Sequence, residues 1–301
     1  MTRLFGCLTA LLFFTLALPA SATLNVFACE PEWSALAGEL GGDKVNLYSA
    51  TTGLQDPHRV EAKPSLLARA RNADLVVCSG AELEIGWLPV VLREASNGKI
   101  QPGSPGYFEA AQYLRLLEKP ARLDRSEGDV HPFGNPHIQT DPRNIALVAQ
   151  ALAKRLAQLD PPNTAYYQSR QQSFSARWTA AIQRWEARAA PLKNMPVAVQ
   201  HKAFSYLIQW LGLNEVATLE PKPGIEPSAA YLSEVLAQLQ RQPVKMVIRA
   251  SYQSDRPSNW IAQRANIPAV ALATTVGGTA NAKDLFSLFD DTLQRLLDAN
   301  K

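Results

Sequence analysis

Short apolar runs alternate with longer amphipathic stretches along the first half of the chain. Apolar runs typical of strands occur at 24–28, 45–49 and 74–78, and stretches with helical periodicity lie between them at about 32–40 and 64–71. Strands that alternate with helices in this way form parallel sheets. The pattern therefore predicts a βαβαβ unit in the first half of the chain.

The second half repeats this alternation. Strand-like runs occur at 196–199, 244–248 and 268–272. Helix-like stretches accompany them at 202–211, 228–241, 256–265 and 282–298. The fold class expected from the whole pattern is α/β, with two lobes that each contain a doubly wound parallel sheet.

The segment between the two halves has helical periodicity without interruption. Neither glycine nor proline occurs between Pro162 and Pro191. Apolar residues recur there at helical spacings, at Tyr167, Phe174, Trp178, Ile182 and Trp185. A single helix over this stretch would be about 42 Å long. Such a helix could join the lobes, although two shorter helices with a loop would also satisfy the pattern.

The N-terminus has the features of a secretory signal peptide. Arg3 precedes a Leu- and Phe-rich run, and Ala20-Ser21-Ala22 provides a small-residue cleavage site. A membrane anchor is the alternative, but the run is shorter than the roughly 20 apolar residues needed to span a bilayer. We therefore expect a signal peptide at 1–22, cleavage after about Ala22, and a periplasmic protein. The expected domains are an N-terminal lobe at 23–160, a linking helix at 161–191 and a C-terminal lobe at 192–301.

Loss of the signal peptide would remove Cys7 and leave two cysteines, Cys29 and Cys78. Each directly follows a strand-like run, and the first and third strands are neighbours in a doubly wound sheet of order 2-1-3. An exported compartment is oxidising. These observations favour a disulfide between the two cysteines, and two separate buried thiols are the alternative.

Composition and charge exclude several classes of function. Of the 301 residues, 47% are hydrophobic and 19% are charged, which is typical of a folded globular protein. The net charge of +3 is too small to indicate a nucleic-acid partner. No phosphate-binding glycine motif and no GxSxG nucleophile motif occur.

The four histidines are the candidates for chemistry. His58 follows the second strand-like run, His201 follows the run at 196–199, and His137 precedes a predicted helix. Ligands of open α/β sheets bind outside the carboxyl ends of the strands. Three imidazoles from two lobes could therefore meet in the cleft and hold a transition metal such as zinc. Spacing alone does not exclude that each histidine is an ordinary polar residue.

The sequences around these histidines resemble the metal-binding segments of a known family. Gln55-Asp56-Pro57-His58, Gly134-Asn135-Pro136-His137 and the segment that begins His201-Lys202-Ala203-Phe204 are similar, in order and spacing, to those of zinc and manganese solute-binding proteins of ABC transporters. The resemblance extends from about Leu24 to Asp298. It implies two α/β lobes bridged by one long helix, with the metal held between them by His58, His137 and His201.

The resemblance also implies a function and partners. Such a protein is not an enzyme; it captures a metal ion and delivers it to the membrane permease of an ABC importer. Zinc binders of this family have a histidine at the position of His201, where manganese binders have a carboxylate. We therefore expect Zn(II) as the transported ligand rather than Mn(II). We also expect the protein to be a monomer and a metallochaperone to be a possible further partner.

The sequence departs from the family pattern in two places. The family's fourth ligand is an aspartate after the last strand, but the stretch 272–278 has threonine there. Water, Asp255 or His131 could take the fourth position. The histidine-rich acidic loop of many zinc-specific members is also absent, because His131 is the only histidine in the segment 97–135.

Two other functions are compatible with three histidines. A secreted zinc-dependent hydrolase also uses three protein ligands and an open position. It would need a general base, and Glu61 is the nearest glutamate in sequence to His58. A metal-binding adhesin of the same fold would differ in its partner rather than in its chemistry.

Overall fold

The computed structural model describes residues 23–120 and 128–301. The N-terminal lobe contains a parallel sheet of order β2-β1-β3-β4. Its strands are β1 (Leu24–Ala28), β2 (Val45–Ser49), β3 (Leu75–Cys78) and β4 (Tyr107–Glu109). Its helices are α1 (Pro31–Gly41), α2 (Pro64–Arg71), α3 (Leu88–Ala95) and α4 (Pro142–Leu159).

The C-terminal lobe contains a second parallel sheet, of order β6-β5-β7-β8. Its strands are β5 (Pro196–Val199), β6 (Asn214–Thr218), β7 (Met246–Ala250) and β8 (Ala269–Leu272). Its helices are α6 (Ser205–Leu211), α7 (Ala229–Arg241), α8 (Arg256–Ala265) and α9 (Leu285–Ala299). The two sheets have the same topology, so the predicted fold class of two doubly wound parallel-sheet lobes is confirmed.

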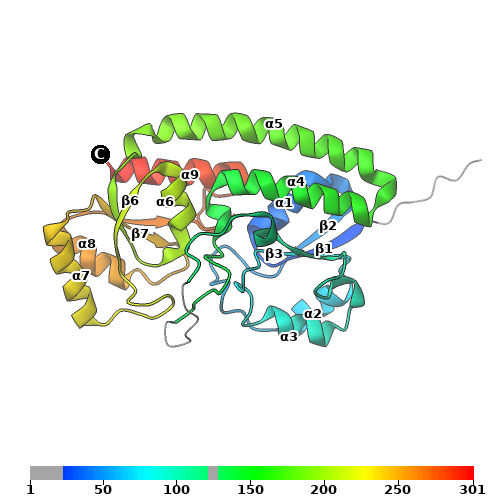
Figure 1. Ribbon diagram of the computed structural model, residues 1–301, viewed down its shortest axis with the longest axis horizontal. Coiled ribbons are helices and arrows are strands. Elements are labelled where there is room, and N and C mark those ends of the chain that lie inside the picture. Colours follow the sequence, from blue (N-terminus) through cyan, green and yellow to red (C-terminus); the bar gives the residue numbers. More distant parts are fainter. Residues whose placement is uncertain (1–22, 121–127) are drawn as a thin grey trace, which may run out of the picture.

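A single long helix, α5 (Thr164–Ala189), runs along one side of the molecule above α4 and α9 (Figure 1). Its 26 residues correspond to about 39 Å. The Trp178 indole donates a hydrogen bond to the Pro142 carbonyl of α4 at 2.7 Å, and the Trp185 indole donates one to Asp290 of α9 at 2.9 Å. The helix thus contacts both lobes, and the interpretation as two helices with a loop is wrong.

The two lobes share one hydrophobic core on the side of α5. Val26 and Leu75 of the first sheet belong to the same buried cluster as Val199 and Ile248 of the second. The apolar side chains of α5 lie in that cluster as well. Because separating the lobes would expose this core to water, their relative arrangement is held by hydrophobic packing.

The structure differs from the sequence prediction at some elements. The strand expected at 244–248 begins at Met246, where pairing with Val197 of β5 starts. Short β4 and half-exposed β6 have no clear apolar run, so the pattern does not indicate them. Helix α3 was also not predicted. The signal peptide expected at 1–22 lies outside the described residues.

The predicted disulfide between Cys29 and Cys78 is present and fully buried. It joins the ends of β1 and β3, which are neighbours in the sheet. The Cys29 amide also donates a hydrogen bond to the Val77 carbonyl at 2.8 Å. The interpretation as two separate thiols is therefore wrong.

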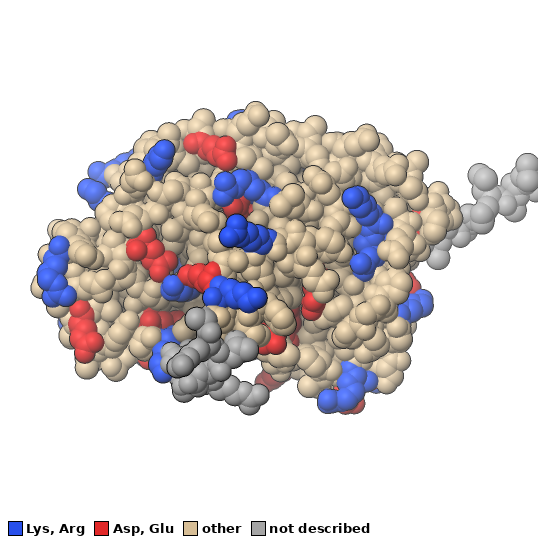
Figure 2. All heavy atoms as spheres, in the orientation of Figure 1, with Lys and Arg blue, Asp and Glu red and all other residues tan. Residues whose placement is uncertain are grey.

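Within the described residues, no helix is both long and apolar enough to cross a membrane. Acidic and basic side chains are scattered among other residues over the face seen in Figure 2. This face has no large patch of a single charge among its described residues.

Candidate metal centre

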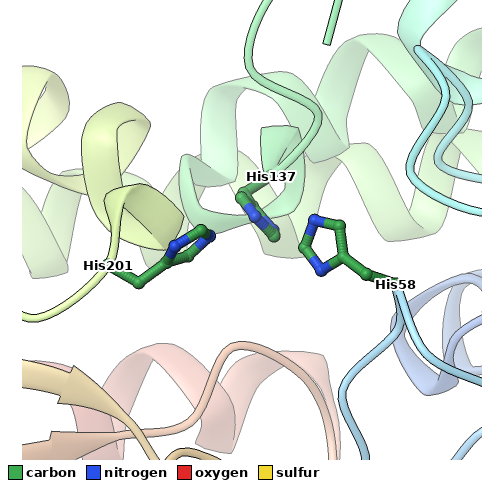
Figure 3. A group of neighbouring side chains, drawn as sticks. All are labelled: His58, His137 and His201. Carbon is green, nitrogen blue, oxygen red and sulfur yellow. The ribbon is translucent and has the colours of Figure 1, made fainter. Parts of the chain in front are cut away.

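Three histidines from separate loops meet between the lobes. His58 lies in the loop after β2, His137 in the loop before α4, and His201 two residues after β5. Their side chains point toward one another (Figure 3), and one nitrogen of each lies within 4.8 Å of the others. The ring centroids of His58 and His137 are 5.2 Å apart, and those of His137 and His201 are 5.5 Å apart. This spacing could accommodate one metal ion among the rings.

Two of the imidazoles are oriented by carboxylates on the side away from the group. His58 Nδ1 lies 2.8 Å from Asp56 Oδ1, and His201 Nδ1 lies 2.7 Å from Glu220 Oε2. His58 Nε2 is buried and has no hydrogen-bond partner. A carboxylate that binds Nδ1–H leaves Nε2 as the ligand atom and increases its basicity. The orphaned nitrogen therefore fits a metal ligand.

The surroundings of the site favour the neutral form of His137 and the ionised form of Asp56. Burial, together with the positive charge that His58 and His201 would carry, holds the pKa of His137 well below its ordinary value. Burial alone would raise the pKa of Asp56, but the hydrogen bonds from His58 outweigh it and lower the pKa. Since a metal ligand must be deprotonated, His137 is ready for coordination without loss of a proton.

The two candidates for a fourth ligand lie in different surroundings. The His131 ring lies beside His58, with centroids 5.3 Å apart, and burial with the neighbouring histidines lowers its pKa to about 4. His131 is not part of the compact group of three. Asp255 is exposed at the start of α8, where it accepts a hydrogen bond from Asn259 at 3.1 Å. This exposed position does not support the prediction that Asp255 is the fourth ligand.

The two threonines of the loop after β8 form hydrogen bonds with residues of the N-terminal lobe. Thr275 is buried, and its hydroxyl donates a hydrogen bond to Glu32 Oε2 and accepts one from the Glu32 amide at 3.0 Å. Thr274 is also buried, and its carbonyl accepts a hydrogen bond from Gln139 at 3.2 Å. In this chain the threonines of 272–278 thus face N-terminal-lobe residues.

Two cavities flank the histidine group. One, of about 370 Å³, is lined by His131, His137 and His201 among others. The other, of about 200 Å³, is lined by His58, His201 and the carboxylates Asp56, Asp129, Glu220 and Glu226. Arg59 lines the second cavity as well, so four carboxylates outnumber one guanidinium beside His58 and His201.

Sequence reasoning missed the role of Asp56 and Glu220. Asp56 lies two residues before His58 in the segment Gln55-Asp56-Pro57-His58, and this spacing was the available signal. Glu220 is 19 residues from His201 and carries no local signal. The nearest glutamate to His58, Glu61, is exposed and lies 3.9 Å from Lys63. Its exposed side chain and its contact with Lys63 give a role as general base no support.

A second group of potential ligands consists of Cys29, Cys78 and Glu84. Both cysteines are used by the disulfide, so they offer no thiolates to a metal. Glu84 lies instead in a buried acidic group with Glu30, near Ser79. Burial raises the pKa of Glu84 to about 7 and that of Glu30 well above its ordinary value.

Comparison with known sequences shows the family to which the chain is similar. The sequence matches the family ZnuA, described as zinc-uptake complex component A periplasmic, over residues 26–299. It is 23% identical over 257 residues to the manganese ABC transporter substrate-binding lipoprotein scaA of Streptococcus gordonii, covering 84% of this chain and 80% of that protein.

Solved structures show the same fold. A crystal structure of ZnuA aligns with a TM-score of 0.78 and 24% identity, covering 93% of this chain and all of the other. The solute-binding protein FpvC of Pseudomonas aeruginosa in complex with Mn²⁺ aligns with a TM-score of 0.77 and 23% identity, covering 92% of this chain and 98% of the other. Similar folds thus occur in a protein named ZnuA and in one solved with Mn²⁺.

Proposed function

The chain belongs to the ZnuA family of metal-binding solute-binding proteins of ABC transporters, and we propose that it captures Zn(II) with His58, His137 and His201. The family is not enzymatic, and it implies an extracytoplasmic protein that delivers a divalent metal to an ABC permease. The finer assignments, which are zinc as cargo and the three ligands, are our proposal.

One observation carries the proposal: three imidazoles converge while carboxylates occupy the outer nitrogens of two of them. Imidazole nitrogen suits Zn(II), whereas Mn(II) favours carboxylate and water ligands. The compact group contains no carboxylate among the described residues. This donor set favours zinc over manganese, with water or His131 in the fourth position.

The same reasoning extends to location and partners. We propose that the signal peptide is cleaved after about Ala22 and that the periplasmic protein works as a monomer with lobes at 23–160 and 192–301. A metallochaperone is a further proposed partner. The cavity lined by Asp56, Asp129, Glu220 and Glu226 supports entry of a cation, because clustered carboxylates attract positive charge.

A competition titration of the metal-free mature protein tests the proposal. We expect one Zn(II) per chain and much weaker binding of Mn(II). His58→Ala and His201→Ala should each weaken Zn(II) binding at least tenfold, because each removes a ligand. His131→Ala measures whether that ring supplies the fourth ligand.

Glu61→Ala is the matched control, since it changes an exposed residue of the same loop. It should leave zinc affinity unchanged. Neither the wild type nor this variant should hydrolyse ester or peptide substrates. Unchanged zinc affinity in both His58→Ala and His201→Ala would refute the proposed site. Tighter binding of Mn(II) than of Zn(II) would refute the proposed cargo.

A further inference from the structure

One buried amide joins the segments that carry His137 and His201. Asn135 is 7% exposed, and its Oδ1 accepts a hydrogen bond from the His137 amide at 2.9 Å. Its Nδ2 donates one to the Lys202 carbonyl at 2.7 Å. His137 precedes α4 of the N-terminal lobe, and Lys202 directly follows His201 of the C-terminal lobe. The side chain of Asn135 therefore bridges the two lobes beside both histidines.

Further contacts hold this amide in place. Glu118 accepts hydrogen bonds from Asn135 Nδ2 at 2.8 Å, from Lys202 Nζ at 2.8 Å and from Ser205 Oγ at 3.0 Å. The Tyr206 hydroxyl donates to the Asn135 carbonyl at 2.7 Å and accepts from the Leu117 amide at 3.0 Å. Both side-chain ends and the carbonyl of Asn135 are thus paired.

Asn135, Ser205 and Tyr206 are buried, whereas Glu118 and Lys202 are partly exposed. A network whose buried polar groups are all paired is rigid and specifies one arrangement. Every partner in this network is a protein group. Hydrogen bonds within the protein therefore hold the segment of His137 beside that of His201. His58 approaches them from a different loop, after β2, in which the Pro57 carbonyl accepts a hydrogen bond from the Trp87 indole at 3.0 Å.

We infer that Asn135 is a positioning residue of the metal site, which fixes His137 relative to His201 before the ion arrives. Glu118 and Tyr206 support it. The inference rests on the proposed function, because it concerns the geometry of the same three ligands. Preorganised ligands lose less conformational freedom on binding, so the network should increase affinity and favour tetrahedral coordination.

Asn135→Ala tests this inference. The substitution leaves the His137 amide and the Lys202 carbonyl without this partner, and residues that orient metal ligands typically contribute 10–100-fold to affinity. We expect Zn(II) affinity to fall roughly tenfold or more. We also expect weaker visible absorption bands when Co(II) replaces Zn(II). The intensity of these bands is high in tetrahedral coordination and falls as the geometry departs from it.

Asn97→Ala is a matched control. Asn97 Nδ2 also donates to backbone carbonyls, those of Ala70 and Ala73, and its Oδ1 also accepts a backbone amide, that of Lys99. This substitution should lower the melting temperature of the metal-free protein while zinc affinity stays within about twofold and the Co(II) spectrum is unchanged. A loss of stability alone would therefore not imitate the effect of Asn135→Ala.

Tyr206→Phe provides a gentler second variant in case Asn135→Ala does not fold. It removes the hydroxyl but keeps the buried ring, and it should weaken zinc binding in the same direction by a smaller factor. Normal affinity and a normal Co(II) spectrum in Asn135→Ala, or in Tyr206→Phe if only that variant folds, would overturn the inference. An equal loss of affinity in Asn97→Ala would also overturn it. The proposed function itself fails if the wild-type protein does not bind Zn(II) or if His58→Ala binds it normally. That result differs from normal zinc binding by Asn135→Ala in a protein whose histidines are required.

Discussion

Glu220 Oε2 lies 2.7 Å from His201 Nδ1, although 19 residues separate them in the chain. The same oxygen accepts a hydrogen bond from the Gly224 amide at 2.8 Å, and Gln253 donates to the other oxygen at 3.3 Å. The carboxylate is thus held by protein contacts at the outer nitrogen of a proposed zinc ligand. The position of the His201 ring depends on a residue of another segment.

Glu220→Ala should therefore weaken zinc binding. Without the carboxylate, the His201 ring loses both its orientation and the increase in basicity, and the expected loss is roughly 10–100-fold in affinity. A competition titration measures it. Glu226→Ala is the control, since Glu226 is an exposed carboxylate that lines the same cavity. Equal losses in both variants would mean that overall negative charge, rather than the contact with His201, determines affinity.

The buried carboxyl of Glu84 should make the metal-free protein less stable as the pH rises. Burial raises its pKa to about 7 in the folded state from 4.5, so the folded state binds more protons between these values. Stability from this group is complete below about pH 4.5 and is lost as the pH rises through about 7. Glu84→Gln, which resembles the protonated acid, should increase stability at pH 8 by up to about 3 kcal/mol and have little effect at pH 4.

Urea denaturation of metal-free protein at the two pH values, with the disulfide intact, measures this difference. Glu84 Oε1 accepts hydrogen bonds from the Ser79 amide at 2.8 Å and from the Gly80 amide at 3.3 Å, and the single side-chain oxygen of glutamine can still accept both. A change of equal size at pH 4 and pH 8 would show that ionisation of Glu84 is not the cause.

Removal of the disulfide should reduce stability without changing zinc affinity. The bond closes a loop with a sequence separation of 49, and loss of such a bond typically costs about 2–5 kcal/mol. The double variant Cys29→Ala, Cys78→Ala avoids leaving a buried free thiol. Urea denaturation gives the stability, and a zinc titration gives the affinity. A loss of affinity as large as that of His58→Ala would contradict the assignment of the bond to the fold alone.

Trp178→Ala in α5 should reduce the stability of the whole molecule. The indole is fully buried, stacks on Phe174 with ring centroids 5.2 Å apart, and contacts Phe286 and Phe289 of α9. Truncation of such a side chain typically costs about 3–5 kcal/mol. Phe133→Ala is the control, because Phe133 is 58% exposed and its loss should change stability by less than about 0.5 kcal/mol. Separate unfolding transitions for the two lobes in the wild type would argue against the shared core.

The sequence by itself determined those features that depend on local pattern. Strand-like runs before Cys29, Cys78 and His201 predicted two parallel sheets and the residues at their carboxyl ends, because the side-chain periods of strands and helices are local properties. The absence of glycine and proline between Pro162 and Pro191 predicted α5 for the same reason. The disulfide followed from the neighbouring positions of β1 and β3.

Only the tertiary structure decided which distant groups act on the histidines. Short β4 and half-exposed β6 have too few apolar residues to stand out, and their places come from pairing with β3 and β5. Glu220 reaches His201, and Asn135 reaches Lys202, through contacts between segments far apart in sequence. Such contacts produce no periodic pattern in the sequence, because they depend on how the lobes pack rather than on the conformation of any one segment.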